Sequence, residues 1–361
     1  MKTKSKRLAN IELLRIVAML MVIMLHYLGK GEVLPEIALQ MDGAGYLAWI
    51  LESLSIVAVN TYVLISGYFL VESEFKPGKL LKLILQVLFY TILVTVLSLA
   101  FGIISVEDLG YYNLIVQIFP FQLEQYWFMT SYLVMFILSP VLALGAKSLT
   151  EKQLRMTIIF FVLFMSVEKS ILPVQIVFDE RGYDALWFIC LFLVAAYIRL
   201  YGIRFLEKPL YAALLYVGGC MLALAENIVL SVIYAKTGEL GHLIGTPMHY
   251  NHIWVLLAAL GFFHLFLHVK MKEGWFSKII CKIAPYTLGV YLLHEHVYIK
   301  YLWPKWLGAG KATSVGGVLL SAIGAVLIVF FVGIIVDYLR SVFFDVVGKV
   351  FGKIGRKKKE R

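Results

Sequence analysis

The chain has 361 residues, of which 61% are apolar types and 16% are charged. Soluble globular proteins carry about 25% charged residues, and a soluble core could not use so much apolar surface. The composition therefore excludes an ordinary soluble domain and predicts a polytopic membrane protein. The net charge of +10 does not indicate a nucleic-acid partner, because the cytoplasmic loops of membrane proteins collect Lys and Arg.

The N-terminal segment has one feature of a cleaved signal peptide, because residues 1–7 are basic and an apolar run follows them. That run carries Glu12 and Arg15, however, and no small-residue cleavage site follows it. We therefore expect a retained helix at the start of the chain.

Apolar stretches close to the length of a membrane span recur along the whole chain. A spanning helix needs about 20 predominantly apolar residues. The pattern predicts an all-α bundle of about ten transmembrane helices, with one membrane domain over residues 1–361 and a basic tail at 340–361. The predicted spans are 8–28, 46–70, 81–104, 126–146, 156–172, 185–203, 210–233, 252–268, 286–303 and 317–338.

The distribution of Lys and Arg predicts the orientation of the chain. If the N-terminus is cytoplasmic and the spans alternate, 25 of the 33 Lys and Arg residues fall in cytoplasmic segments and 7 in outside segments. Cytoplasmic segments carry this excess in membrane proteins. We therefore expect both termini in the cytoplasm, with the tail at 340–361 lying on anionic lipid.

The first predicted span carries three ionisable residues, which are costly in a membrane and therefore indicate function. Arg15 and His26 are 11 positions apart, so about 1100° of rotation brings them within about 20° of one helix face. Glu12 lies three positions before Arg15 and shares that face. A guanidinium binds phosphates and carbonyls, and an imidazole accepts and returns a proton. The alternative is an interfacial Glu12–Arg15 ion pair with His26 as an ordinary interfacial residue.

Polar residues also occur in two later spans. Those of the second span either line an internal passage or serve helix packing, and the sequence leaves both open. Glu226 interrupts the seventh span, either as a packing residue or as part of a site. The polar residues of the second span are Glu52, Ser53, Ser55, Asn60, Thr61, Tyr62 and Ser66.

The spacing of His and Cys does not favour a metal site. Two histidine pairs have the spacing of neighbours on a helix, but neither has a third ligand at a fixed spacing: His264 with His268, and His249 with His252. On a regular helix His294 and His296 would lie about 200° apart. The three cysteines lack a paired spacing: Cys190, Cys220 and Cys281. We therefore expect no bound metal.

Four segments resemble the membrane acyltransferase-3 family and occur in the family's order. The segment NIELLRIVAMLMVIMLHY at 10–27 carries the opening Arg-x10-His pattern on Arg15 and His26. The segment NTYVLISGYFL at 60–70 is similar to the family's second-helix ending. The segments YWFMTSYLVMFILSP at 126–140 and TLGVYLLHEH at 287–296 are similar to its Trp-Phe-Leu segment and its late Leu-Gly-x-Tyr-Leu-x-His motif.

The resemblance implies a stand-alone enzyme of the bacterial plasma membrane. Such proteins transfer an acetyl or other acyl group from acyl-coenzyme A to a hydroxyl of a cell-surface or lipid-linked carbohydrate. Many relatives carry an additional C-terminal hydrolase-like domain, and we expect this chain to act without one. We therefore expect it to complete the transfer itself or to pass the group to a separate extracytoplasmic transferase or glycan-assembly protein.

The resemblance also implies roles for particular residues. The family's His is thought to be catalytic and its Arg to serve donor binding, which assigns these roles to His26 and Arg15, with Glu12 orienting Arg15. Acetyl-coenzyme A is the expected donor substrate. Its phosphates are expected near the lysines of the loop that follows the second span, which are Lys76, Lys79 and Lys82. The residues expected on the acceptor side are Ser66, Tyr126, Trp127, His294 and His296.

Two other functions fit the physical pattern of the chain. A carrier or flippase for a glycan-linked lipid or small metabolite would also need many spans and intramembrane charges. A membrane sensor or assembly factor without chemistry of its own would tolerate the loss of both Arg15 and His26. Binding of acetyl-coenzyme A distinguishes the enzyme from the carrier.

Overall fold

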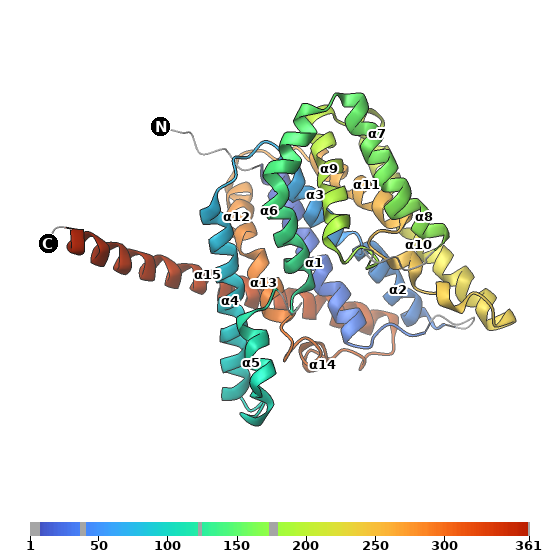
Figure 1. Ribbon diagram of the computed structural model, residues 1–361. Helices are drawn as coiled ribbons and strands as arrows, with labels where there is room; N and C mark the ends of the chain where they lie inside the picture. The colour runs from blue at the N-terminus through green and yellow to red at the C-terminus, as the bar shows by residue number, and fades with distance from the viewer. Residues whose placement is uncertain (1–7, 37–40, 122–124, 173–179, 360–361) are drawn as a thin grey trace.

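The computed structural model describes residues 8–36, 41–121, 125–172 and 180–359, and side chains as far as Lys349. Helices are the regular elements of these residues and form one bundle (Figure 1). The α-helices are α1 (Ala9–Lys30), α2 (Gly43–Ser55), α3 (Ala58–Leu70), α4 (Pro77–Ala100), α5 (Tyr111–Ile118), α6 (Trp127–Ser148), α7 (Glu151–Val162), α8 (Glu168–Ile171), α9 (Ala185–Tyr201), α10 (Pro209–Thr237), α11 (Ile253–His268), α12 (Trp275–Ile283), α13 (Thr287–His294), α14 (Trp303–Trp306) and α15 (Val315–Lys359).

Eight helical segments of the described residues are long and apolar enough to cross a membrane, which confirms the polytopic class. They correspond to eight of the ten predicted spans. The predicted span at 185–203 is α9, which is apolar but has only 17 residues. The predicted span at 156–172 lies on α7, α8 and the π-helical turn Leu163–Val167 between them. The eight segments are Ala9–Lys30, Gly43–Leu70, Pro77–Ala100, Trp127–Ser148, Pro209–Thr237, Gly241–His268, Trp275–His294 and Val315–Lys349.

The predicted span at 286–303 is displaced in the structure. The apolar segment is Trp275–His294, in which α12 and α13 are joined by a short 3-10 turn. Lys278 and Lys282 interrupt the apolar run of α12, so a search for apolar runs placed the start of the span too late. Helix α13 ends at His294, so the argument that placed His294 and His296 on one regular helix does not apply.

Helix α1 lies inside the bundle and packs against α2, α3, α11, α12, α13 and α15. Its buried apolar residues recur at the spacing of successive helical turns, but neighbours on several sides bury more than one face. Side chains anywhere on α1 therefore point into protein more often than toward lipid. The buried apolar residues of α1 are Ile11, Leu14, Ala18, Met19, Val22, Ile23, Leu25, Tyr27 and Leu28.

Helices α3 and α9 approach closely at Gly67, in the Ser-Gly-Tyr ending of the second predicted span. A Cβ atom at Gly67 would lie 2.9 Å from the Cβ of Ala195 and 3.0 Å from the Cα of Phe192. Small residues permit this kind of close helix packing in membrane proteins. The glycine therefore has a packing role, and it fixes the distance of α3 from α9.

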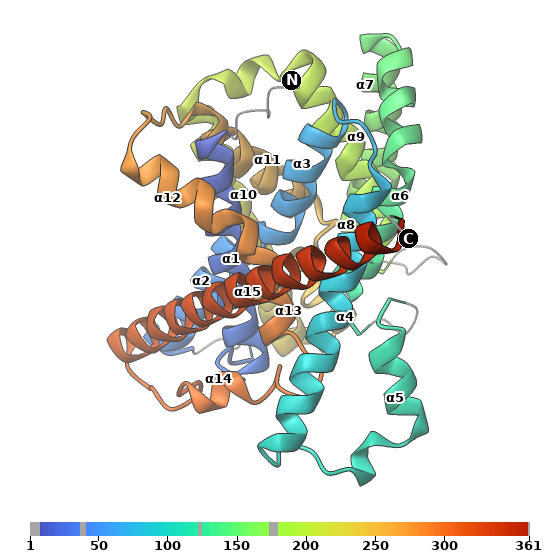
Figure 2. The same ribbon diagram turned by 90° about the vertical axis from the view of Figure 1, so that its left-hand side faces the viewer.

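Helix α15 crosses α1 and α13 at a steep angle, and its C-terminal end projects from the bundle (Figures 1 and 2). The predicted basic tail at 340–361 forms the end of this helix as far as residue 359. Asp337, which is fully buried, anchors the crossing. Its Oδ1 accepts hydrogen bonds from Gln86 Nε2 (3.0 Å) and Tyr90 Oη (2.9 Å) of α4, and from Arg340 Nε (2.6 Å).

We expect Asp337→Asn to destabilise the protein, because Arg340 would keep its charge in a largely buried position without a counter-charge. Breaking a buried ion pair from one side costs about 3–5 kcal/mol. The measurement is thermal unfolding of the purified protein in detergent. Asp345→Asn, an exposed position on the same helix, is the matched control, and equal melting temperatures for the two variants would contradict the assignment.

Candidate functional site

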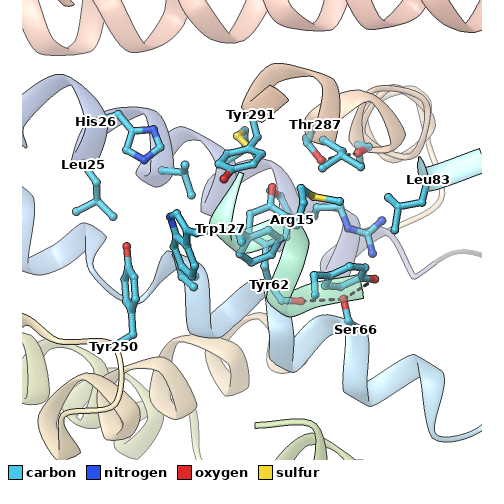
Figure 3. A pocket seen from close by; sticks show the side chains of 18 of the residues that line it. Arg15, Leu25, His26, Tyr62, Ser66, Leu83, Trp127, Tyr250, Thr287 and Tyr291 are labelled. Atoms are coloured by element: carbon cyan, nitrogen blue, oxygen red, sulfur yellow. Dashed lines mark hydrogen bonds between the residues drawn. The ribbon is translucent and has the colours of Figure 1, made fainter. Parts of the chain in front are cut away.

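An internal cavity of about 290 Å³ lies between α1, α3, α6 and α13. Arg15 and His26 both line it, which is the arrangement that their spacing predicts (Figure 3). Most of the remaining wall is apolar or aromatic. The other lining residues are Met19, Val22, Leu25, Val59, Tyr62, Ser66, Leu83, Trp127, Phe128, Met129, Tyr132, Tyr250, Ala284, Pro285, Thr287, Leu288 and Tyr291.

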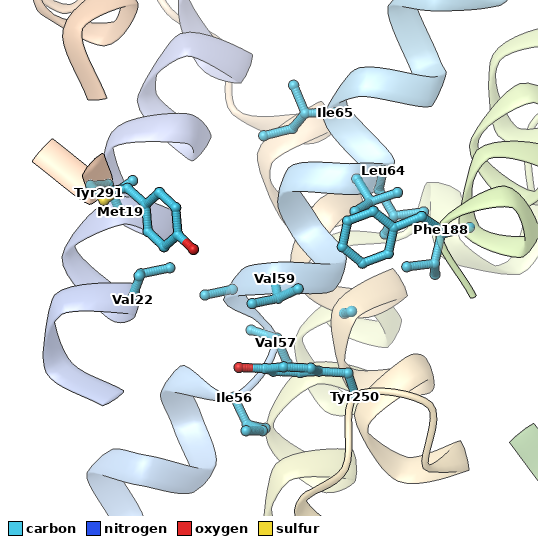
Figure 4. Close-up of a cluster of buried hydrophobic side chains, with 14 of the residues drawn as sticks. Met19, Val22, Ile56, Val57, Val59, Leu64, Ile65, Phe188, Tyr250 and Tyr291 are labelled. Carbon is cyan, nitrogen blue, oxygen red and sulfur yellow. The ribbon is translucent and has the colours of Figure 1, made fainter. Parts of the chain in front are cut away.

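Packed apolar side chains support this wall. At the edge of the cavity, Met19 and Val22 of α1 face Val59 of α3. Leu64 of α3 and Phe188 of α9 lie on the opposite side of α3 (Figure 4). Interiors packed in this way resist rearrangement. The two ends of the cavity are therefore held at a fixed separation of about 16 Å along α1, which is the rise of 11 residues.

The Arg15 end of the cavity is a hydrogen-bonded group. Arg15 Nη1 pairs with Glu12 Oε2 at 3.0 Å, so Glu12 holds the guanidinium from the side away from the cavity. Tyr62 Oη donates to the backbone oxygen of Arg15 at 2.8 Å. Ser66 Oγ donates to the backbone oxygen of Tyr62 at 3.0 Å and lies 3.4 Å from Tyr132 Oη. Of the polar residues of α3, Tyr62 and Ser66 line the cavity, whereas Asn60 and Thr61 serve packing.

The His26 end is a cluster of four ionisable side chains from α1 and from the end of α13. His26 Nδ1 lies 2.9 Å from His294 Nε2 and 3.2 Å from Glu295 Oε2. Lys30, one helical turn beyond His26, forms an ion pair with the same oxygen of Glu295. His294 and Glu295 are only 3% and 5% exposed, so the cluster is closed on the side away from the cavity.

The hydrogen bonds of this cluster assign the protons of both imidazoles. His294 Nδ1 lies 2.6 Å from the backbone oxygen of Val290. A carbonyl oxygen only accepts, so His294 Nδ1 carries the hydrogen and its Nε2 is an acceptor. His26 must then donate from Nδ1 to His294. In neutral His26 the lone pair is on Nε2, the nitrogen that is free to meet a molecule in the cavity.

The structure places the other residues predicted for the site at varying distances from the cavity. Trp127 and Ser66 line it. Tyr126 is buried behind the wall, where its hydroxyl donates to the backbone oxygen of Leu292 at 2.9 Å. His294 contacts His26 instead of the cavity. The three lysines at the start of α4 are exposed and lie outside the wall, although Leu83 of the same helix lines it: Lys76, Lys79 and Lys82.

His296 belongs to a separate polar group beyond the end of α13. Its Nε2 lies 3.1 Å from Gln125 Nε2, whose amide also donates to Gln117 at 3.2 Å. Burial lowers the pKa of the His296 imidazole to about 4, so the ring is neutral at pH 7. It joins α5 and the start of α6 to the chain after α13 and does not line the cavity.

Several residues of the site were not identified from the sequence. Glu295 and Lys30 lie next to His26, and Tyr250, Thr287 and Tyr291 line the cavity. Glu295 directly follows His294 in the segment TLGVYLLHEH, so its place in the site could have been predicted from the sequence. The pairing of Lys30 with Glu295 spans 265 positions of sequence, and no local pattern reports it.

The sequence of most of the chain matches a known family. Residues 8–337 match the family model described as an acyltransferase domain. No curated protein and no solved structure matched the chain.

The cluster at the His26 end also has the composition of a metal site. Among the described residues, His26, His294 and Glu295 could each offer one ligand atom, and these atoms lie within 4.8 Å of one another. Lys30 already occupies the carboxylate oxygen, and its positive charge opposes a cation there. In one histidine pair considered from the sequence, each ring has a backbone partner: His264 Nδ1 contacts the Leu260 oxygen and His268 Nε2 the Leu206 oxygen.

We expect the purified protein to contain only substoichiometric transition metal and to keep its melting temperature after chelator treatment. The reason is that Lys30 pairs with Glu295 and the two imidazoles pair with each other, so these groups have partners without an ion. Elemental analysis and thermal unfolding with and without chelator measure this. Stoichiometric zinc that is lost in His294→Ala would contradict it.

Proposed function

This chain belongs to the acyltransferase-3 family, and from that premise we propose that it transfers an acyl group, most simply acetyl, from acetyl-coenzyme A to a hydroxyl of a cell-surface or lipid-linked carbohydrate. One observation carries the proposal: Arg15 and His26 line the same internal cavity from opposite ends. A cation that binds the donor and a base that activates the acceptor can therefore act in one cavity.

The Arg15 end is the proposed donor end. A guanidinium remains charged and donates several hydrogen bonds to phosphate or carbonyl oxygens. Glu12 occupies only Nη1 in the described contacts, which leaves donors directed to the cavity. The exposed lysines at 76, 79 and 82 begin α4, whose Leu83 reaches the same end of the cavity. We assign to them the phosphates of coenzyme A, with Arg15 next to the thioester arm.

His26 is the proposed general base. Its Nε2 accepts the proton of the acceptor hydroxyl as the oxygen attacks the thioester carbon. When the carbon–sulfur bond breaks, the imidazolium returns the proton to the departing thiolate, and free coenzyme A and an ester are formed. While His26 is charged, its Nδ1–H faces Glu295 Oε2 at 3.2 Å, an oxygen that it shares with Lys30.

His294 is the proposed positioning residue for His26. It accepts the Nδ1 hydrogen and so presents the lone pair of Nε2 to the cavity. The Val290 oxygen holds His294 in the required tautomer. Proteins usually prepare a catalytic histidine in this way: a fixed hydrogen bond at one ring nitrogen decides whether the other nitrogen carries a hydrogen or a lone pair.

The remaining parts of the proposal concern location and partners. Cytoplasmic termini would place the Arg15 end toward the cytoplasmic supply of acyl-coenzyme A and the His26 end toward the outer face, in a bacterial plasma membrane. Trp127 would then contact the acceptor, with Tyr126 and His296 supporting that end from behind the wall, whereas Ser66 lies at the donor end. A separate extracytoplasmic transferase or glycan-assembly protein would receive the product.

We expect His26→Ala to lower the rate of thiol release from acetyl-coenzyme A by about 10²–10⁴-fold, the range for loss of a general base. The assay uses membranes that hold the chain's own envelope glycans. Membrane abundance should be unchanged, since the ring is small and borders a cavity.

His242→Ala, in the segment before α11 and away from the cavity, is the matched control. Normal turnover by His26→Ala would refute the proposed mechanism. Absence of turnover in the wild-type protein would instead favour a carrier, because a carrier does not cleave the thioester.

We expect His294→Gln to retain much more activity than His294→Leu. The amide oxygen of Gln can accept the hydrogen of His26 Nδ1. Leu removes this acceptor and leaves only Glu295 Oε2 at 3.2 Å, which Lys30 already engages. A wrong tautomer at a catalytic histidine is costly, so the Leu variant should lose about 10²-fold or more in kcat. Steady-state kinetics of both variants measure the difference, and equal losses would show that His294 does not act through this hydrogen bond.

A further inference from the structure

No described residue accepts a hydrogen bond from the hydroxyl of Tyr291, whose nearest backbone neighbour is Phe128 in the first turn of α6. The side chain is 6% exposed and lines the cavity. Its ring centroid lies 6.5 Å from that of His26. An unsatisfied buried polar group costs about 1–3 kcal/mol, so a group retained in this state needs an explanation. A ligand atom in the cavity that accepts this hydrogen bond provides one.

The N-terminus of α6 lies at the same part of the wall. Helix α6 begins at Trp127, and its N-cap residue Tyr126 provides no side-chain cap. Trp127, Phe128 and Met129, the first three residues of the helix, all line the cavity. The N–H groups of the first helical turn lack α-helical acceptors, and the helix dipole makes this end positive. Met129 N donates to the Tyr126 oxygen at 2.8 Å, so the N–H groups that concern the cavity are those of Trp127 and Phe128. Helix N-termini therefore attract negative charge.

The indole of Trp127 adds a third donor held in a fixed position. Its ring packs against those of Tyr183 and Tyr250, at centroid distances of 4.3 and 5.8 Å, and these two tyrosine rings lie 4.7 Å from each other. Ser131 Oγ binds the Tyr183 backbone oxygen at 3.0 Å, and Asn60 Nδ2 binds the Tyr250 oxygen at 2.7 Å. The indole nitrogen points toward the side of the cavity on which His26 lies (Figure 3).

Donors line this part of the cavity, and the carboxylates near it lie behind the wall: Glu295 near Tyr291, and Glu52 near Tyr183 and Tyr250. Arg15 is the only charged residue other than the histidine among the described lining residues, and no Asp or Glu lines the wall. The nearest carboxylate to His26, that of Glu295, is paired with Lys30. The wall opposite His26 is thus electrostatically suited to an oxygen that becomes negative.

We propose that Tyr291 Oη, Trp127 Nε1 and the N-terminus of α6 form the oxyanion site for acyl transfer, an inference that rests on the proposed function. When the acceptor oxygen bonds to the thioester carbon, the carbonyl oxygen takes up the electron pair of its π bond and becomes negative. Tyr291 and Trp127 donate to that oxygen while His26 holds the proton. The pair then returns, the carbon–sulfur bond breaks, and the proton moves to the sulfur.

Tyr291→Phe tests this proposal because it removes one oxygen atom and preserves the ring. Loss of one oxyanion donor lowers kcat by about 10²–10³-fold. The KM for acetyl-coenzyme A should remain within about threefold, since the donors act on charge that develops only in the transition state. The melting temperature should change little, because no described residue accepts the hydrogen of this hydroxyl.

Tyr216→Phe is the matched control. Its hydroxyl donates to the backbone oxygen of Leu54 at 2.9 Å, away from the cavity. This variant should lose stability and keep kcat, the reverse of Tyr291→Phe. Trp127→Phe should lower kcat as well, together with some stability because the stack is shortened.

The outcomes separate this inference from the proposed function. Acetyl-coenzyme A with membranes carrying the native envelope glycans is the probe, and thiol release is the readout. Suppose that the wild-type protein releases thiol. The oxyanion site is then overturned if Tyr291→Phe has an unchanged kcat, or if its affinity for acetyl-coenzyme A falls by the same factor as kcat. The acyltransferase assignment stands in both cases. If the wild-type protein releases no thiol, both are overturned.

Discussion

The hydrogen bond between His26 and His294 joins two helices that are 268 positions apart in the sequence. It brings the end of α1 against the end of α13, where Glu295 and Lys30 complete the cluster. Ionisable side chains are costly within a membrane unless they satisfy one another. The cluster is stable there because each member has a partner, and this mutual satisfaction leaves one nitrogen of His26 for the cavity. The tautomer of the proposed base is therefore a consequence of how the fold is closed.

The position of α1 inside the bundle makes this arrangement possible. A helix at the edge would expose one face to lipid, and a polar stripe on it would have to be hidden by an oligomer. Here α1 has neighbours on several sides, so Arg15 and His26 can border an internal space. Close packing of α3 on α9 at Gly67 and the anchoring of α15 through Asp337 hold the helices that surround this space. Residues with no chemical role thus determine the distance between the two functional ends.

The sequence predicted the class of fold and part of the site for identifiable reasons. Apolar run length is a strong signal in membrane proteins because the bilayer fixes it, and the spacing of Arg15 and His26 on one helix is purely local geometry. The break that ends α13 at His294 was not visible, because Lys278 and Lys282 hid the start of the segment and shifted the predicted span toward the C-terminus. That shift moved Glu295 into a presumed helix, and its partners Lys30 and His26 are distant in sequence. The unsatisfied hydroxyl of Tyr291 depends entirely on tertiary packing.

The two ends of the cavity differ in chemistry, and that difference gives the proposed reaction a direction. The Arg15 end has a permanent charge with its own counter-ion and suits a donor that is anionic throughout the cycle. The His26 end has a titratable ring, a fixed hydrogen-bond acceptor behind it and donors across from it, which suits groups whose charge changes during the reaction. A wall without carboxylates between them lets a thioester extend from one end to the other without repulsion. The same separation keeps the permanent cation about 16 Å from the imidazole along α1, far enough that it does not suppress protonation of His26 during the transfer.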